Sequence, residues 1–75
     1  MNAQRRKEIA KAIELIQQAR EILEGVKDEE QEAFDNLPES LQRSDLGEKM
    51  EFCYSGIEDF IEYLDTDELQ GIIDA

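Results

Sequence analysis

The residues with the greatest potential for chemistry are two groups of charged side chains. The first group is basic and lies within residues 5–11: Arg5, Arg6, Lys7 and Lys11. Near the start of a helix, where backbone N–H groups lack intrahelical partners, such cations favour a phosphate or a nucleotide. A simpler interpretation is surface pairing with the acidic residues near the C-terminus, namely Asp65, Asp67, Glu68 and Asp74. The sequence leaves both interpretations open.

The second group is acidic and lies within residues 28–39: Asp28, Glu29, Glu30, Glu32, Asp35 and Glu39. Such a run could bind a basic protein, imitate a phosphate backbone or hold a cation through carboxylate oxygens. Its spacing fits neither the alternating oxygen ligands of calcium loops nor the Glu-x-x-His pairs of di-iron bundles. We therefore predict no metal site, and the run is either a partner-binding surface or a solvated helix end.

Residues typical of enzyme active sites are scarce. The chain has no histidine, and Cys53 is its only cysteine. An intramolecular disulfide is thus impossible, and the common zinc and haem ligand sets are missing. No hydroxyl residue has a base at informative spacing, and no Gly-rich phosphate loop occurs. We predict a protein that is not an enzyme and uses no cofactor, with Cys53 buried as a small apolar residue.

Helical periodicity organises the elements that would position these residues. Apolar residues recur every three or four positions over residues 3–34, which predicts an amphipathic helix with Gly25 as its kink or close-contact point. Residues 35–45 contain the only proline and are predicted to be a connection. A second regular stripe predicts a helix over residues 46–64, and residues 66–73 form a short helix or its continuation. Asn36, Ser44 and Thr66 are the predicted N-caps.

These elements predict an all-α fold with a single domain over residues 1–75, built as an antiparallel helical hairpin with a short C-terminal helical extension. A core of this size yields only about 3–5 kcal/mol, and Leu15 and Ile22 widen the apolar face of the first helix. We therefore expect assembly into a homo-oligomeric helical bundle. Phe52 and Tyr63 fall off the main stripe and are predicted at an oligomer or partner interface, whereas Phe60 is predicted in the core.

The charge of the chain limits its partners and its location. The net charge is −12, and residues 27–75 hold three Lys/Arg against sixteen Asp/Glu. This acidity excludes direct binding to nucleic acid and to anionic membranes. No apolar stretch approaches the roughly 20 residues of a membrane span, and charged residues interrupt the apolar run that a signal peptide would need. We expect a cytoplasmic protein.

The segments RRKEI and DEEQEAFDNLPESLQRSDLGEKME, together with the acidic second arm, resemble a group of short, uncharacterised helical proteins from bacteriophages and prophages. The resemblance covers most of the chain and implies a phage accessory protein in a bacterial host cell, without supplying site residues. The favoured prediction is antagonism of a host antiviral defence system by binding a host protein through the acidic run. The alternatives are an oligomeric sponge for a nucleotide signal, bound by the basic group, and an acidic DNA mimic or structural assembly adaptor.

Overall fold

The computed structural model describes all residues 1–75 and contains helices but no strands. In chain order the elements are α1 (Ala3–Asp35), α2 (Glu39–Gln42), α3 (Asp45–Ile61), the 3₁₀ helix η1 (Glu62–Leu64) and α4 (Asp67–Asp74). The all-α prediction is confirmed. The predicted connection over residues 35–45 contains one short helix, α2, and the second long helix tightens into η1 over its last turn.

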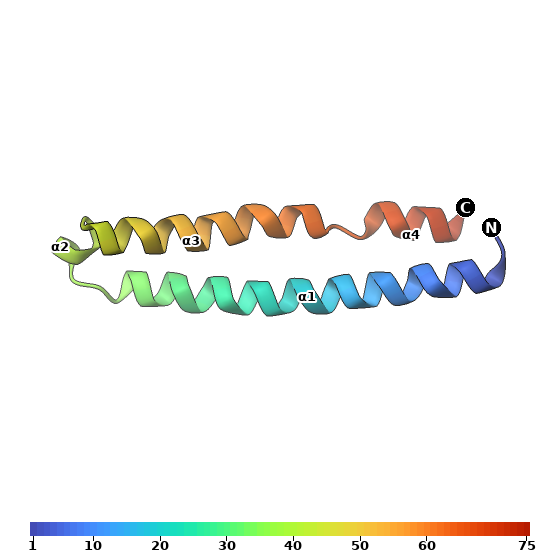
Figure 1. The fold of residues 1–75 in the computed structure, drawn as a ribbon, viewed down its shortest axis with the longest axis horizontal. Helices are drawn as coiled ribbons and strands as arrows, with labels where there is room; N and C mark the ends of the chain where they lie inside the picture. Colours follow the sequence, from blue (N-terminus) through green and yellow to red (C-terminus); the bar gives the residue numbers. More distant parts are fainter.

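The second arm, formed by α3, η1 and α4, runs back alongside α1 (Figure 1), so that the two chain termini lie at one end of the molecule and the turn at the other. Contacts along the arms include the Phe34 and Tyr54 rings, whose centroids are 5.7 Å apart. Near the termini, Gln17 Nε2 donates to Thr66 Oγ1 at 3.4 Å. The molecule measures 58 × 14 × 13 Å with a radius of gyration of 17.6 Å. A compact domain of this length would have about 11 Å, so the protein is a rod two helices thick.

A polar side chain caps the start of each long helix. Asn2 caps α1 by accepting from the Arg5 N–H at 2.8 Å. Ser44 caps α3 by accepting from the Gly47 N–H at 3.4 Å, so this prediction is confirmed. The N-cap prediction for Asn36 is wrong: this residue ends α1, and its own N–H donates to the Glu32 carbonyl oxygen at 3.0 Å.

Thr66 occupies the N-cap position of α4 but makes no capping hydrogen bond. Asp65 caps the start of α4 instead: its Oδ1 accepts from the Asp67 N–H at 2.9 Å. The Thr66 hydroxyl is engaged by Gln17 from the other arm. The prediction was thus right about where the helix starts and wrong about which side chain caps it.

The turn is held by two residues that the sequence analysis did not single out. The last carbonyl groups of a helix have no intrahelical partners. Gln42 Nε2 donates to those of Phe34 and Asp35 at 3.2 and 3.4 Å, and to the carbonyl oxygen of Leu37 in the turn at 3.2 Å. Gly47 is buried in the first turn of α3, where a Cβ atom would lie 2.6 Å from the Leu41 carbonyl oxygen and collide with the Gln42 carbonyl group. Only glycine allows α2 to pack this closely on α3.

The buried core is very small. Ile13 and Ile61 are the buried hydrophobic residues, at 7% and 6% exposure, and no large side chain is fully buried. The predictions that Cys53 and Phe60 are buried are wrong for this chain, since Cys53 is exposed and Phe60 is 53% exposed. The physical reason is that each arm has one neighbour, which covers only the part of its apolar face that points directly at it. Gly25 lies within a continuous α1 and a Cβ there would meet nothing within 4 Å, so the close-contact prediction is also wrong.

Candidate functional site

Many of the apolar side chains that the contact between the arms leaves uncovered lie along one side of the rod. On α1, residues spaced by 4, 3 and 4 positions share one helical face, and on the second arm the residues come from α3 and η1. We call this surface the apolar edge: Leu15, Ala19, Ile22, Leu23, Val26, Phe52, Cys53, Phe60 and Tyr63. Its two arms meet in an open hollow of about 300 Å³ lined by Leu23 of α1 and by α3 residues that include Phe52 and Phe60.

Aromatic rings are the most exposed members of the apolar edge. Phe52 is 80% exposed and Tyr63 is 84% exposed. The Tyr63 ring lies next to that of Phe60, with centroids 6.4 Å apart. Both residues that the sequence singled out as interface aromatics therefore lie on this one surface, although their role in an interface stays a prediction.

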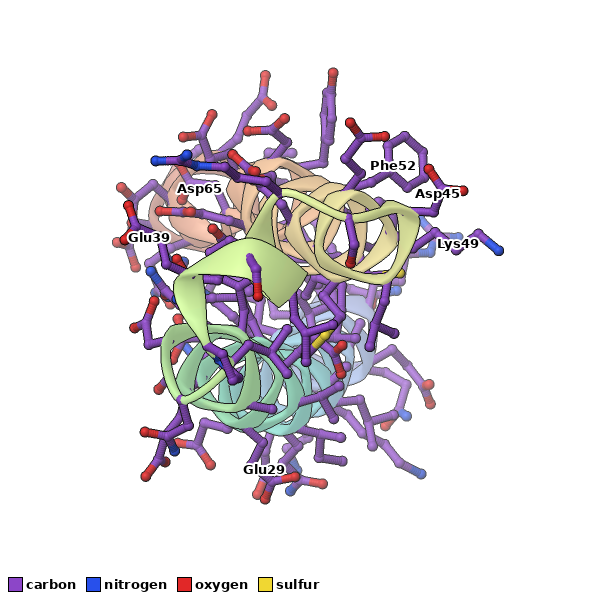
Figure 2. The ribbon with its side chains drawn as sticks, turned by 90° about the vertical axis from the view of Figure 1, so that its left-hand side faces the viewer. Glu29, Glu39, Asp45, Lys49, Phe52 and Asp65 are labelled. Carbon is purple, nitrogen blue, oxygen red and sulfur yellow. The ribbon has the colours of Figure 1, made fainter.

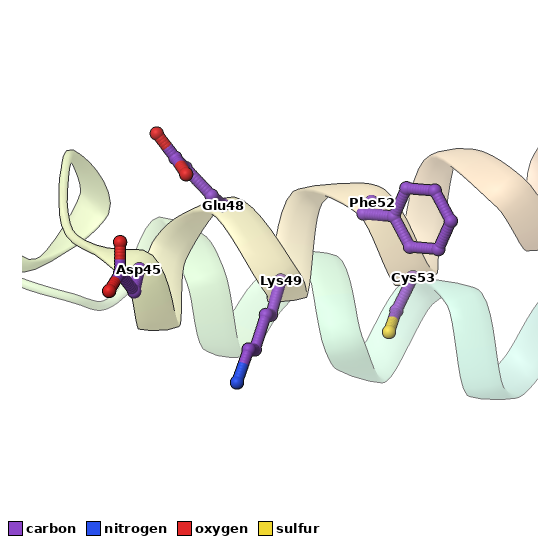
Figure 3. Close-up of a pocket in the computed structure, with 5 residues that line it drawn as sticks. All are labelled: Asp45, Glu48, Lys49, Phe52 and Cys53. Carbon is purple, nitrogen blue, oxygen red and sulfur yellow. The ribbon is translucent and has the colours of Figure 1, made fainter.

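A second open hollow extends the apolar edge toward the turn. It has a volume of about 400 Å³ and is lined by Asp45, Glu48, Lys49, Phe52 and Cys53. Figure 3 shows Cys53 and Lys49 directed toward α1, whereas Glu48 points away from it. Three charged residues thus border the apolar surface where it approaches the turn.

The opposite side of the rod carries charge from both arms. An open hollow of about 290 Å³ there is lined by Arg20, Glu24, Lys27, Asp28, Glu58, Ile61 and Glu62. Within it, Lys27 Nζ lies 3.0 Å from Asp28 Oδ1, and Arg20 Nε lies 3.2 Å from Glu24 Oε1. The hydrogen bond with Asp28 raises the pKa of Lys27, and the charges of Glu58 and Glu24 act in the same direction.

Tyr54 extends this charged surface toward the turn. Partial burial raises the pKa of its hydroxyl, and the negative charges of Glu51, Asp35 and Glu58 raise it further. Carboxylates of α1 and α3 therefore lie near one another across the gap between the arms. We call this surface the acidic edge, with six carboxylates: Glu24, Asp28, Asp35, Glu51, Glu58 and Glu62.

The two edges can be told apart in a view along the rod from its turn (Figure 2). Phe52 and Lys49 lie on one side, whereas Asp65 and Glu39 lie on the other, and Glu29 extends from the outer face of α1. An α-helix turns by about 100° per residue, so a run of consecutive acidic residues cannot share one face. The structure accordingly spreads the acidic run predicted from the sequence over several surfaces.

Only Asp28 and Asp35 of that run belong to the acidic edge. Glu30 is half-buried, Glu32 is exposed, and Glu39 pairs with Arg43 at 2.8 Å within α2 and its cap. The sequence analysis missed the other four members of the edge, Glu24, Glu51, Glu58 and Glu62. Their signal was helical periodicity: Glu51, Glu58 and Glu62 are spaced by 7 and 4 positions, as Glu24 and Asp28 are by 4.

The basic group does not converge on one site. Arg5 and Lys7 lie about 160° apart around α1, and all four cations are exposed. Arg6 Nη2 donates to the Ala75 carbonyl oxygen at 3.5 Å, while the ion pairs of the structure involve Arg20, Lys27 and Arg43. The single chain therefore forms neither the nucleotide site nor the ion pairs with the C-terminal acidic residues that were the two interpretations of this group.

No group of three or more Cys, Asp and Glu side chains is arranged to hold a metal ion. None of the helices combines the length and the apolar character needed to cross a bilayer. Comparison of the chain with protein-family models, curated proteins and solved structures finds no match. What the geometry offers is recognition through two extended surfaces, one apolar and one acidic.

Proposed function

We propose that this chain is a non-catalytic phage accessory protein that antagonises a host antiviral defence system by binding a basic host protein. The observation that carries the proposal is the acidic edge, on which the two arms present six carboxylates beside two cations, Arg20 and Lys27. A surface of one sign attracts an oppositely charged partner and accelerates the encounter. The resemblance of the sequence to phage proteins supplies the host-defence setting.

A protein partner is favoured over a nucleotide signal by the way the charges are arranged. The acidic edge draws carboxylates from both arms, whereas the basic group points in divergent directions around α1. The backbone donors near the start of α1 are also partly used, because Asn2 accepts from the Arg5 N–H. A phosphate would therefore find no converging cations in the single chain and a helix end at which one donor is already used.

The proposal includes an antiparallel helical hairpin that assembles into a homo-oligomeric bundle. The bundle binds its target through the acidic edges on its outer surface. Support comes from the separation of the two edges: a copy that covers the apolar edge leaves the acidic edge free. Oligomerisation also multiplies the number of acidic edges, and several weak contacts to one target raise the overall affinity.

The experiment compares two variants with the same change in charge. Glu58→Lys/Glu62→Lys reverses two carboxylates on the acidic edge, and Glu8→Lys/Glu29→Lys reverses two exposed carboxylates away from it. Each protein is expressed in bacteria that carry a panel of defence systems, and the plating efficiency of a sensitive phage is measured. We expect the wild type and the Glu8/Glu29 variant to restore plating in one defended host, and the Glu58/Glu62 variant to lose at least about 100-fold of that rescue.

Two outcomes contradict the proposal. If the wild type restores plating in no defended host, the anti-defence function fails. If both variants protect equally well, the acidic edge is not the contact surface and the proposed mechanism is wrong.

A further inference from the structure

The chain as a whole exposes more surface than a compact folded chain of this mass normally leaves in water. The accessible area is 5836 Å² for 8.7 kDa. A compact monomer of that mass exposes about 4,700 Å², so about 1,100 Å² is in excess. A standard interface buries about 800 Å² per partner. The excess is sufficient for one such interface.

We propose that a second copy of this chain covers the apolar edge, related by a two-fold axis perpendicular to the long axis of the rod. This pairing rests on the homo-oligomer included in the proposed function and specifies its surface and direction. The turn of each copy lies toward the termini of the other. In this arrangement α1 packs against α1 and α3 against α3, each pair antiparallel.

The composition of the edge fits a self-complementary contact. A two-fold interface uses the same patch on both copies, and this patch is aliphatic along α1 and aromatic along α3. Ile22 of α1 is 67% exposed and Phe52 of α3 is 80% exposed. Aromatic residues carry much of the energy of interfaces, and the small size of Ala19 in the middle of the α1 stripe lets two helices approach closely.

The direction of the pairing follows from the uneven charge along the rod. The half at the termini, residues 1–20 and 65–75, carries five Lys/Arg against six Asp/Glu. The half at the turn, residues 21–64, carries three against fourteen. A parallel pairing would place two strongly acidic halves side by side within about one Debye length, whereas the antiparallel pairing places each beside a nearly neutral half.

The first test uses one substitution at two exposed alanines of α1. Ala19→Arg places a cation within the α1 part of the apolar edge, and Ala10→Arg places it on the opposite face of the same helix. Both reduce the net negative charge equally, so only the surface differs. Sedimentation equilibrium at tens of micromolar should give twice 8.7 kDa, or a higher even multiple, for the wild type and Ala10→Arg. Ala19→Arg should raise the dissociation constant at least about 100-fold.

A monomeric wild type overturns the pairing, and so does an Ala19→Arg variant that associates as tightly as Ala10→Arg. These masses are measured on the purified protein without any host factor. A failure of the anti-defence assay therefore leaves this inference standing, and a monomer that still protects a phage overturns the pairing alone.

The second test measures whether the two copies run antiparallel or parallel to each other. In a Cys53→Ser background, a spin label at Gln4→Cys reports the distance between the terminal ends of the two copies by pulsed electron resonance. The label lies about 20 residues from the middle of the apolar edge, so the antiparallel pairing predicts about 60 Å between labels. A parallel pairing would hold them within the width of a four-helix bundle, below about 25 Å. The short distance would overturn the antiparallel arrangement, and the long distance would support it.

Discussion

The apolar edge and the acidic edge are made by the same helices from neighbouring residues. Leu23 lines the hollow of one edge and Glu24 lines that of the other. On α3, Phe60 and Glu58 are separated by two positions and have the same opposed placement. Because a helix turns about 100° per residue, such pairs are directed to opposite sides of the rod. The three hollows of this rod are open, and the side of each helix that a residue occupies decides which of the two surfaces it joins.

The largest expected effect comes from disturbing the packing of α2 on α3, because this packing fixes how the two arms face each other and hence where both edges lie. Gly47→Ala would place a methyl group against the carbonyl groups of Leu41 and Gln42. We expect a loss of about 3 kcal/mol in the free energy of unfolding, because backbone atoms cannot move aside as a side chain can. Urea unfolding followed by circular dichroism measures it.

The control for this prediction is the same substitution at Gly25, where a Cβ would meet nothing within 4 Å. Gly25→Ala should stabilise the helix by up to about 1 kcal/mol. If Gly47→Ala proved as harmless as Gly25→Ala, the close packing of the turn would be wrong, and the two edges would not be held in a fixed relation.

A smaller effect on stability should distinguish the apolar edge from the acidic edge. Ile22→Ala/Phe60→Ala removes apolar surface from one edge, and Glu58→Ala/Glu62→Ala removes charge from the other. In a single chain, truncating side chains this exposed costs little. If a second copy covers the apolar edge, we expect a loss of about 2 kcal/mol per chain for the Ile22/Phe60 variant.

The dependence of stability on protein concentration shows whether such a loss comes from a broken contact between two copies or from a less stable single chain. The melting temperature of an associating protein rises with its concentration. The wild type and the Glu58/Glu62 variant should show this rise between micromolar and hundreds of micromolar, and the Ile22/Phe60 variant should lose it. An equal concentration dependence in all three would place the interface elsewhere.

Much of the helical architecture could be predicted from the sequence, because apolar periodicity and capping residues are local signals. The helices near residues 3–34 and 46–64 and the cap at Ser44 required only neighbours in the chain. Asn36 was misplaced because the same polar residue suits both the end of one helix and the start of another. Gly47 was missed because its requirement arises from the backbone of α2, a segment that the sequence did not predict as a helix.

The candidate surfaces were harder to predict, since they depend on which face of each helix meets the other arm. The acidic run over residues 28–39 attracted attention by its density, but the acidic edge draws on carboxylates spaced by one or two helical turns on both arms. Cys53 and Phe60 lie on a regular apolar stripe, which indicates burial without saying by what. In a two-helix rod that stripe is wider than the contact, and the residues beyond the contact become a surface.

The smallest predicted effect concerns Tyr54, which connects the contact between the arms with the acidic edge. Burial and the charges of Glu51, Asp35 and Glu58 raise the pKa of its hydroxyl in the folded chain above the ordinary value. The folded state therefore holds this proton more tightly than the unfolded state does. The resulting stability is fully present below the ordinary pKa of tyrosine, near 10, and is lost as pH rises through the raised value.

We therefore expect the midpoint of urea unfolding to fall between pH 9 and pH 11.5 and the fall to be smaller in Tyr54→Phe. Lys27, whose pKa is also raised, contributes in the same direction and remains in that variant. In a Tyr63→Phe background, tyrosinate absorbance at 295 nm follows Tyr54 alone, and Glu51→Gln/Glu58→Gln should bring its titration to lower pH. If that double substitution left the titration unchanged, the carboxylates of the two arms would not act together at Tyr54, and the acidic edge would reduce to separate charges on two helices.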